Sequence, residues 1–222
     1  MNSDRGTGVA WAPTYSKGIR NIHIIEEWPF QDGQYRKVPS QIAYARENGD
    51  LEENVWGFGI EHKHKSYSWT KLLLDRDADT TSYDDPSIAE HIGSGFMQLP
   101  QFRTAEAVCE DFLREVYDHI MAVLNQEMNE ASMLVTKMEV WITLPAIWSD
   151  KAKAATLTAA RNAGFGSREG DEIYTISEPE AAALAVIEEL TVNDGQINAL
   201  KVREMSCDNL LSLILSSRAS TY

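Results

Sequence analysis

Cysteine is scarce in this chain of 222 residues, which contains only Cys109 and Cys207. Two cysteines cannot form the disulfide framework of a small secreted domain, and they favour a reducing compartment such as the cytoplasm. Long apolar runs are absent as well, because the stretch at 210–215 is interrupted by Ser212 and is too short to span a bilayer. Residues 1–6 lack the apolar segment of a signal peptide. We therefore expect a cytoplasmic protein that has no membrane partner.

Positively charged residues are outnumbered: lysine and arginine total 20, whereas aspartate and glutamate total 34, so the net charge is −14 at pH 7. A chain this acidic repels DNA, RNA and other polyanions at long range. We therefore expect no nucleic-acid partner. The acidity does not exclude a nucleotide ligand such as ATP, because a nucleotide site needs only local hydrogen-bond donors.

Several common catalytic and ligand-binding motifs are also missing. The sequence contains no Gly-x-x-x-x-Gly-Lys-Ser/Thr loop and no Gly-x-Gly-x-x-Gly pattern after a predicted strand. It has no Cys-x-x-Cys pair, and no serine or cysteine lies in the setting of a nucleophile elbow. His62 and His64 alternate along a predicted strand and have no further ligands nearby, so we predict no metal site.

The second half of the chain alternates helices and strands. Residues 104–130 place apolar side chains at intervals of three and four, the helical period, and Thr104 is the predicted N-cap. The later predicted elements are a strand over Met138–Leu144 that Pro145 ends, a helix over Asp150–Ala163 between Ser149 and Gly164, a strand over Ile173–Ile176, and a helix capped by Ser177. Strands that alternate with helices predict a parallel pair joined by a right-handed crossover.

The first half of the chain is β-rich. Strand-forming residues recur at 8–12, 19–25, 38–44 and 55–60, and turn signals separate them. Residues 75–100 are polar and rich in turn formers, so we predict a loop there. The whole chain is therefore predicted to be an α/β protein, in which a β-meander precedes a helix-strand-helix-strand-helix series.

Two segments of the second half resemble a known family. Residues 178–185 read EPEAAALA, and residues 140–150 read VWITLPAIWSD. Together they resemble the nucleotide-binding domain of the heat shock protein 70 family, in the actin-like ATPase superfamily, and most of all its divergent fungal group. The resemblance implies the ribonuclease-H-like first lobe of such a domain, with ATP and magnesium as ligands. It also implies a chaperone whose ATP hydrolysis is coupled to the binding of unfolded polypeptides and co-chaperones.

The resemblance assigns roles to particular residues. Glu178 matches the glutamate near the γ-phosphate and its magnesium shell, where a carboxylate can hold a metal-bound water. Pro145 matches the proline that relays the nucleotide state to the rest of the chaperone. Lys71 takes the place of the catalytic lysine, or else is a solvated lysine at a helix start. Gly6 and Thr7 are a remnant of the first phosphate-binding loop.

A structural explanation covers the same helix start without any catalysis. Ser177 and Glu180 form a capping box, in which each side chain serves the backbone N–H of the other. Pro179 fits the first turn, where its missing donor is tolerated. The carboxylate of Glu178 complements the helix dipole there. The catalytic and the structural explanation of Glu178 both stay open at this point.

The sequence departs from the family at both ends. The strand that should precede Gly6 is missing, and no glycine cluster follows Gly195. We therefore expect residues 1–190 to be a partial first lobe, with the second lobe missing, and residues 191–222 to be a divergent tail that is disordered or non-native. These departures predict a truncated remnant of a chaperone ATPase, impaired in ATP binding and hydrolysis.

Two alternative functions accompany this prediction. The chain is a non-enzymatic protein-interaction module that keeps the fold of the lobe, or a gene-model fragment with no function of its own. A partial lobe should also leave an unpaired strand edge near residues 173–176. The apolar stretch at 210–215 either covers that edge or is itself prone to aggregation, so we expect the chain to be marginally stable and to self-associate.

Overall fold

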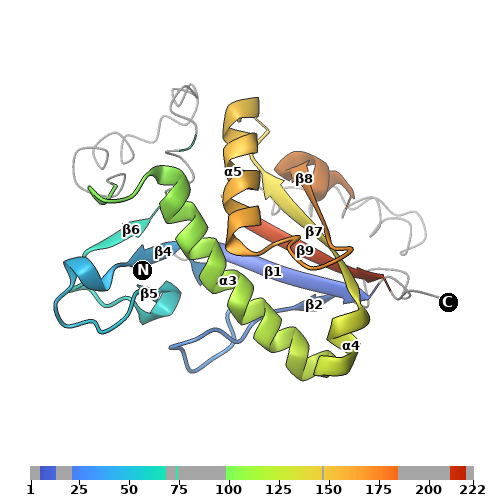
Figure 1. Ribbon diagram of the computed structural model, residues 1–222, viewed down its shortest axis with the longest axis horizontal. Helices are drawn as coiled ribbons and strands as arrows, with labels where there is room; N and C mark the ends of the chain where they lie inside the picture. Colours follow the sequence, from blue (N-terminus) through green and yellow to red (C-terminus); the bar gives the residue numbers. More distant parts are fainter. Residues whose placement is uncertain are drawn as a thin grey trace, which may run out of the picture.

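A computed structural model describes residues 6–13, 22–68, 74, 99–146, 148–184 and 211–218. Within these ranges the chain is α/β: two helices cover one face of a large sheet, and a small sheet lies beside them (Figure 1). The strands of the large sheet are β1 (Gly6–Pro13), β2 (His23–Ile24), β3 (Val38–Pro39), β7 (Lys137–Leu144), β8 (Glu172–Ser177) and β9 (Leu211–Arg218). The small sheet consists of β4 (Gln41–Ala43), β5 (Val55–Trp56) and β6 (Ser66–Ser68).

The order of strands in the large sheet is β2-β1-β9-β7-β8, and β3 also pairs with β1. The strands β7 and β8 run parallel, with Val140 opposite Ile173, which confirms the predicted parallel pair. The strand β9 runs parallel to β1 and antiparallel to β7. Along β7, alternate residues from Met138 to Leu144 are buried, as expected for a strand with one face toward the core.

The helices α3 (Ala105–Met128) and α5 (Asp150–Ala163) pack against each other on this face of the sheet. Thr104 and Ser149 are their N-caps, and each side chain accepts a hydrogen bond from a backbone N–H of the first turn, as predicted. Gly164 ends α5 with a φ of 119°. A Cβ at Gly164 would lie 2.7 Å from a ring carbon of Tyr117, so both the turn and the close approach of α3 require glycine.

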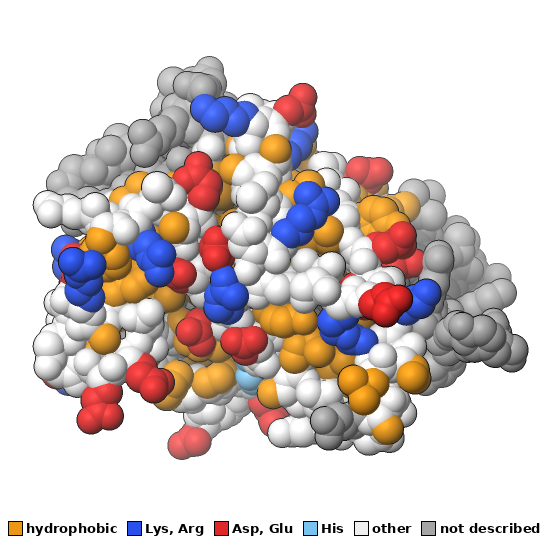
Figure 2. Space-filling model, in the orientation of Figure 1, with side chains coloured by type: hydrophobic (Ala, Val, Ile, Leu, Met, Phe, Trp, Pro, Cys, Tyr) orange, Lys and Arg blue, Asp and Glu red, His pale blue; other side chains and the backbone are white. Residues whose placement is uncertain are grey.

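The small sheet rests on the amino-terminal half of α3, and its short strands are linked by 3₁₀ turns η2 (Ala45–Glu47) and η3 (Gly57–Gly59). Its aromatic side chains join the same hydrophobic core as the large sheet. Trp56 packs edge-on against Phe112 of α3, with ring centroids 6.0 Å apart. Red and blue side chains are interspersed over the face that carries α3 and α5, with small apolar areas between them (Figure 2).

Several sequence-based predictions differ from the structure. A further helix, α4 (Glu130–Val135), follows α3 because Asn129 has a φ of 58° and interrupts the predicted 104–130 helix. The predicted strand 55–60 continues as η3 after Trp56. His62 and His64 lie in a turn and not in a strand, since the N–H of His64 donates to the carbonyl of Glu61. Most of the predicted loop at 75–100 lies outside the described residues.

The carboxyl-terminal stretch does not cover the edge near residues 173–176, so that alternative was wrong. It forms part of β9, which pairs with β1 on one side and β7 on the other. A position between two strands offers hydrogen-bonding partners on both sides, whereas the edge of β8 offers them on one. Of the predicted tail 191–222, residues 211–218 are described, and the rest lies outside the described residues.

Candidate functional site

The predicted site residues that the structure describes lie along one edge of the large sheet, the edge formed by the strand ends (the end of β7, the end of β8 and the start of β1). Leu144, at the end of β7, faces Ser177, at the end of β8. At the start of β1, Thr7 faces Leu211 of β9. Since Ile142 faces Leu213 in an antiparallel pair, the same register brings Leu211 level with Leu144. Thr7 and Ser177 therefore lie in one row, three strand spacings or about 14 Å apart.

Pro145 lies immediately beyond this row, in the turn that joins β7 to α5. It is buried, and its carbonyl accepts a hydrogen bond of 3.2 Å from the N–H of Trp148. Proline fits this position because β7 has ended and no ladder donor is needed. Trp148 is itself buried, so the turn is fixed to the core before Ser149 starts the helix. The predicted relay role of Pro145 stays a prediction.

Glu178 begins the helical residues 178–184 that follow β8, at the same edge of the sheet. It is half-buried, and its Oε1 atom is enclosed by protein. The hydroxyl of Ser177 accepts a hydrogen bond of 3.3 Å from the N–H of Glu180, which is one half of the predicted capping box. A carboxylate in this first turn complements the helix dipole. The catalytic role of Glu178 stays a prediction.

Gly6 and Thr7 belong to β1 and not to a loop. They pair with Pro39 and Val38 of β3, and Thr7 also pairs with β9. A Cβ at Gly6 would lie 2.8 Å from the carbonyl oxygen of Val38, so the close approach of β3 accounts for this glycine. Both residues therefore lie in strand ladders, and their role as a remnant of a phosphate-binding loop stays a prediction.

The hydroxyl of Ser40 lies 2.9 Å from the hydroxyl of Thr7, and this partner was missed by the sequence analysis. Thr7 is 1% exposed, so its hydroxyl is satisfied inside the protein and does not face a ligand in solution. Nothing in the sequence near Ser40 indicated this contact, since it joins residues 33 positions apart. Lys71, the predicted catalytic lysine, lies outside the described residues.

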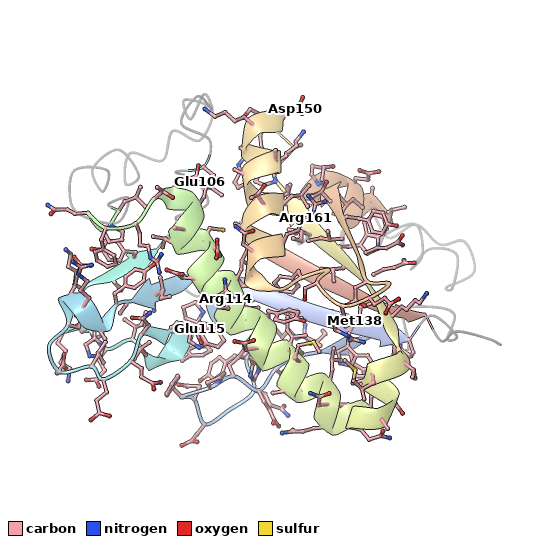
Figure 3. The ribbon with its side chains drawn as sticks, in the orientation of Figure 1. Glu106, Arg114, Glu115, Met138, Asp150 and Arg161 are labelled. Atoms are coloured by element: carbon pink, nitrogen blue, oxygen red, sulfur yellow. The ribbon has the colours of Figure 1, made fainter. Side chains whose placement is uncertain are left out.

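The electrostatics of this edge are mixed. The amino-terminal end of α5 presents its positive dipole end there, and Asp150 in its first turn complements it (Figure 3). Asp150 is exposed and lies 3.7 Å from the ammonium group of Lys153. Glu178 and Glu180 add two carboxylates at the neighbouring helix start. Among the described residues, this edge therefore carries the carboxylates of Asp150, Glu178 and Glu180 together with the ammonium groups of Lys151 and Lys153.

Two titratable groups with perturbed pKa values, Tyr44 and His119, lie away from this edge. Burial, assisted by a hydrogen bond to Asp111, raises the pKa of the Tyr44 hydroxyl far above its ordinary value. Burial lowers the pKa of His119, whose Nε2 lies 2.8 Å from the carbonyl of Glu27. Both groups join α3 to the β-rich half, so their perturbation reflects packing. Within the described ranges, no group of His, Cys, Asp and Glu side chains is arranged to hold a metal ion.

None of the described helices combines the length and apolar character that a bilayer span requires. No family model matches the chain. The chain is similar to proteins named chaperone protein HscA homolog from strains of Pseudomonas aeruginosa, with 26% identity over 164 residues in one and 25% in another. The aligned part covers 71% of this chain and 24% of each relative, so the chain spans about a quarter of their length. This distant similarity supports an Hsp70-like family.

Proposed function

We propose that this chain is a remnant of an Hsp70-like chaperone ATPase lobe, which keeps the α/β scaffold and binds ATP weakly or not at all. The proposal rests on the similarity to the HscA homologs and on the α/β architecture. The observation that carries it is the position of Gly6 and Thr7 inside β1, where strand pairing occupies the residues that resemble a phosphate-binding loop. A cytoplasmic location, as for a soluble chaperone, is part of the same proposal.

The expected loss of affinity is large. Each charge-assisted hydrogen bond to a phosphate contributes about 1.5–3 kcal/mol. A chain without about four such bonds loses at least about 6 kcal/mol, which corresponds to a factor above about 10⁴ in the dissociation constant. The carboxylates of Glu178 and Glu180 work in the same direction, because they repel a triphosphate that lacks its magnesium ion, whereas Asp150 is offset by Lys151 and Lys153.

The separation within the row also supports weak binding. A phosphate held beside Thr7 would lie about 14 Å from Ser177, the residue that precedes Glu178. A carboxylate acts on a metal-bound water only at hydrogen-bonding distance. Because β9 lies between β1 and β7, the separation is one strand spacing larger than it would be if β1 and β7 were neighbours. Within the proposal, Glu178 and Pro145 occupy the positions of a catalytic glutamate and a relay proline, but no bound nucleotide is there for either role.

Isothermal titration calorimetry with ATP and magnesium tests this proposal. We expect no saturable binding at micromolar ATP for the full chain, and micromolar affinity would contradict the proposal. Glu178→Gln provides a second test, since glutamine keeps the shape of the side chain. If a preparation hydrolyses ATP, this variant should reduce turnover, while Glu180→Gln at the exposed neighbouring position should not. Unchanged turnover in Glu178→Gln would reject the catalytic role of Glu178.

The second candidate is a non-enzymatic interaction module with unfolded polypeptides or co-chaperones as partners. Leu134 and Val135, both exposed on α4, favour it, because neighbouring exposed apolar side chains suit contact with another protein. A Leu134→Ser, Val135→Ser double variant should lose binding to a permanently unfolded model polypeptide if this candidate is correct. Equal binding by the variant and the wild type would argue against a role for α4.

A further inference from the structure

The loop between β2 and β3, residues 26–37, presents two aromatic side chains to solvent. Phe30 is 66% exposed and Tyr35 is 42% exposed. The ring of Tyr35 lies against the ring of Phe58 in η3, with centroids 5.0 Å apart. The ring of Phe30 lies over Gly59, since a Cβ there would be 2.7 Å from its Cδ2 atom. The three rings therefore form one aromatic surface beside the small sheet.

This loop is held in a fixed conformation. The N–H of Tyr35 donates to the carbonyl of Glu26, and the indole N–H of Trp28 donates to the carbonyl of Tyr35, both at 2.7 Å. Trp28 is buried, and the Nε2 atom of His119 on α3 lies 2.8 Å from the carbonyl of Glu27. The aromatic surface is thus anchored to the core before any partner arrives, which lowers the entropic cost of binding.

Neither the backbone nor the core explains a phenylalanine at position 30. The φ of Phe30 is 65°, a left-handed conformation that glycine and asparagine adopt readily and bulky side chains rarely do. Most of its ring is in solvent, so burial explains little of it. Strained residues of this kind cluster where proteins bind ligands or partners. The identity of Phe30 therefore points to a contact outside this chain.

Carboxylates border the three rings. Glu53 is exposed and lies two residues before Val55, whose side chain borders Gly59 together with the ring of Phe30. Glu115 lies on the side of α3 toward the small sheet (Figure 3). Figure 2 shows red side chains next to apolar ones where α3 passes this loop. We call this region the acidic-aromatic surface, which consists of Phe30, Tyr35, Phe58, Glu53 and Glu115.

The charge of Glu115 is not balanced within the chain. Burial raises the pKa of its carboxyl, and the negative charges of Asp118, Asp111 and Glu53 add to the rise. The positive charge of Arg114 offsets only part of it. A positive charge from outside the chain would therefore stabilise the ionised carboxylate. An apolar partner would instead bury the carboxylate further without compensation.

We propose that the acidic-aromatic surface binds a basic segment of another polypeptide, one that combines arginine with apolar side chains. A guanidinium can stack on the exposed rings and pair with the carboxylates, which a lysine ammonium does less well. A polyanion is repelled by the net charge of −14, and a second copy of this chain carries that same charge. The proposal concerns different residues from those of α4 and does not depend on ATP binding.

Fluorescence anisotropy with the full chain tests this inference. The probe is a short fluorescein-labelled peptide of repeated Arg-Leu-Gly, and the matched probe replaces every arginine with glutamine. We expect the arginine peptide to bind about tenfold more tightly, because only this peptide supplies positive charge. Its advantage should shrink in high salt, which screens the carboxylates.

Phe30→Asn is the main variant, because asparagine fits the left-handed backbone while the ring is removed. It should weaken binding of the arginine peptide about tenfold, as loss of an aromatic side chain at the centre of an interface does. Its melting temperature should stay close to that of the wild type. Leu134→Ser, at an exposed apolar position on α4, is the control and should leave the affinity unchanged. Tyr35→Ser replaces Phe30→Asn if that variant does not fold.

Glu115→Gln tests the acidic part of the surface. It should weaken binding of the arginine peptide about threefold at low salt, the effect of losing one partly exposed ion pair. Glu169→Gln is the matched control, because it removes the same charge from an exposed turn that precedes β8. This control should leave the affinity unchanged.

Four results would overturn the proposal. The first is the absence of saturable binding of the arginine peptide. The second is equal binding of the arginine and glutamine peptides, which would mean a surface for apolar chains of any charge. The third is equal weakening by Glu115→Gln and Glu169→Gln, which would mean general attraction to an acidic protein. The fourth is a wild-type dimer in sedimentation that Phe30→Asn converts to a monomer, because the occupant would then be a second copy of this chain.

Discussion

The small sheet and the large sheet are stabilised in different ways. The large sheet and its helices are joined by apolar packing: α5 buries Ala152, Ala159 and Ala160, and α3 buries Val116 and Ile120. Alanine is small enough to let the two helices approach closely. Polar contacts between α3 and α5 lie at the surface, where Arg114 donates to the carbonyl of Asn162 (Figure 3).

The small sheet shares the apolar core but adds a network of polar side chains. Its strands have only two or three residues each, so few backbone hydrogen bonds join them. The amide of Asn48 donates to the carbonyls of Tyr44 and Lys65, and its oxygen accepts from the N–H of Lys65. The carboxylate of Glu47 accepts hydrogen bonds from Lys65 and Tyr67.

In the small sheet, side-chain hydrogen bonds therefore add to the short strand ladders. Apolar packing is insensitive to pH, whereas a carboxylate network depends on its charge. The two regions should therefore respond differently to the same kinds of substitution and to acid. The predictions that follow compare the regions, in order of decreasing effect.

The largest effect is expected in the apolar region. Leu113 on α3 is 1% exposed, so Leu113→Ala should lower the free energy of unfolding by about 2–5 kcal/mol, through lost burial and the cavity that remains. Leu134→Ala is the matched control, because Leu134 on α4 is 79% exposed and its loss should change stability by less than about 0.5 kcal/mol. Urea unfolding followed by circular dichroism measures both. Equal effects would contradict the assignment of α3 to the core.

The polar region should respond most to the loss of Asn48. The change Asn48→Ala removes three hydrogen bonds and leaves the buried carbonyl of Tyr44 and the partly buried backbone groups of Lys65 without these partners, so we expect a loss of about 2–3 kcal/mol. The matched control is Asn54→Ala, since Asn54 is exposed and accepts one hydrogen bond from Ala45. Hydrogen exchange would locate the loss. If the variant destabilises both sheets equally, the small sheet has no separate polar stabilisation.

Local chemistry made the second half of the chain predictable. The bounds of α5 were correct because Ser149 and Gly164 act through their own backbone neighbourhood. The parallel pair of β7 and β8 followed from the alternation of elements. Because β7 and β8 are parallel neighbours, the structure brings Leu144-Pro145 and Ser177-Glu178 to the same end of the two strands.

Contacts between distant segments could not be predicted in the same way. The pairing of β9 with β1 joins residues about two hundred positions apart, and no local pattern specifies it. The same holds for the hydroxyl contact between Thr7 and Ser40. The strand β6 was missed because Ser66-Tyr67-Ser68 is short and has little apolar alternation. For the candidate site, the sequence indicated individual residues such as Thr7 and Glu178, but the separation between Thr7 and Ser177 depends on β9.

The pH dependence of the small sheet should reflect Glu47. Burial acts to raise the pKa of this carboxyl, but hydrogen bonds from Lys65 and Tyr67 outweigh it and lower the pKa below 4.5. Because the pKa is depressed on folding, the stabilisation is present above the unfolded value and is lost as the pH falls through the folded value. Glu47→Gln should cost about 1 kcal/mol at pH 7 and progressively less below pH 4.5. The control is Glu52→Gln, at an exposed position. A difference between Glu47→Gln and the wild type that does not shrink in acid would contradict this account.

The smallest expected effect is a difference in how two glutamates of α3, Glu106 and Glu115, contribute to the free energy of unfolding (Figure 3). Burial raises the pKa of Glu115, and the negative charges of Asp118, Asp111 and Glu53 add to the rise. A carboxyl whose pKa is raised on folding favours the folded state most at low pH, and this stabilisation is lost as the pH rises through the folded value. Glu115→Gln should therefore raise the free energy of unfolding at pH 7 by a few tenths to about 1 kcal/mol.

The matched substitution Glu106→Gln should act in the opposite direction. Glu106 is exposed in the first turn of α3, where its charge complements the helix dipole, so its loss should lower stability by about 0.3–1 kcal/mol. Thermal unfolding at pH 7 and at pH 4 measures both variants. The advantage of Glu115→Gln should disappear at pH 4, where the carboxyl of Glu115 is largely protonated in the folded chain. If both variants shift the free energy of unfolding in the same direction at pH 7, the predicted contrast is wrong, and the common shift is due to helix propensity and not to the surroundings of each charge.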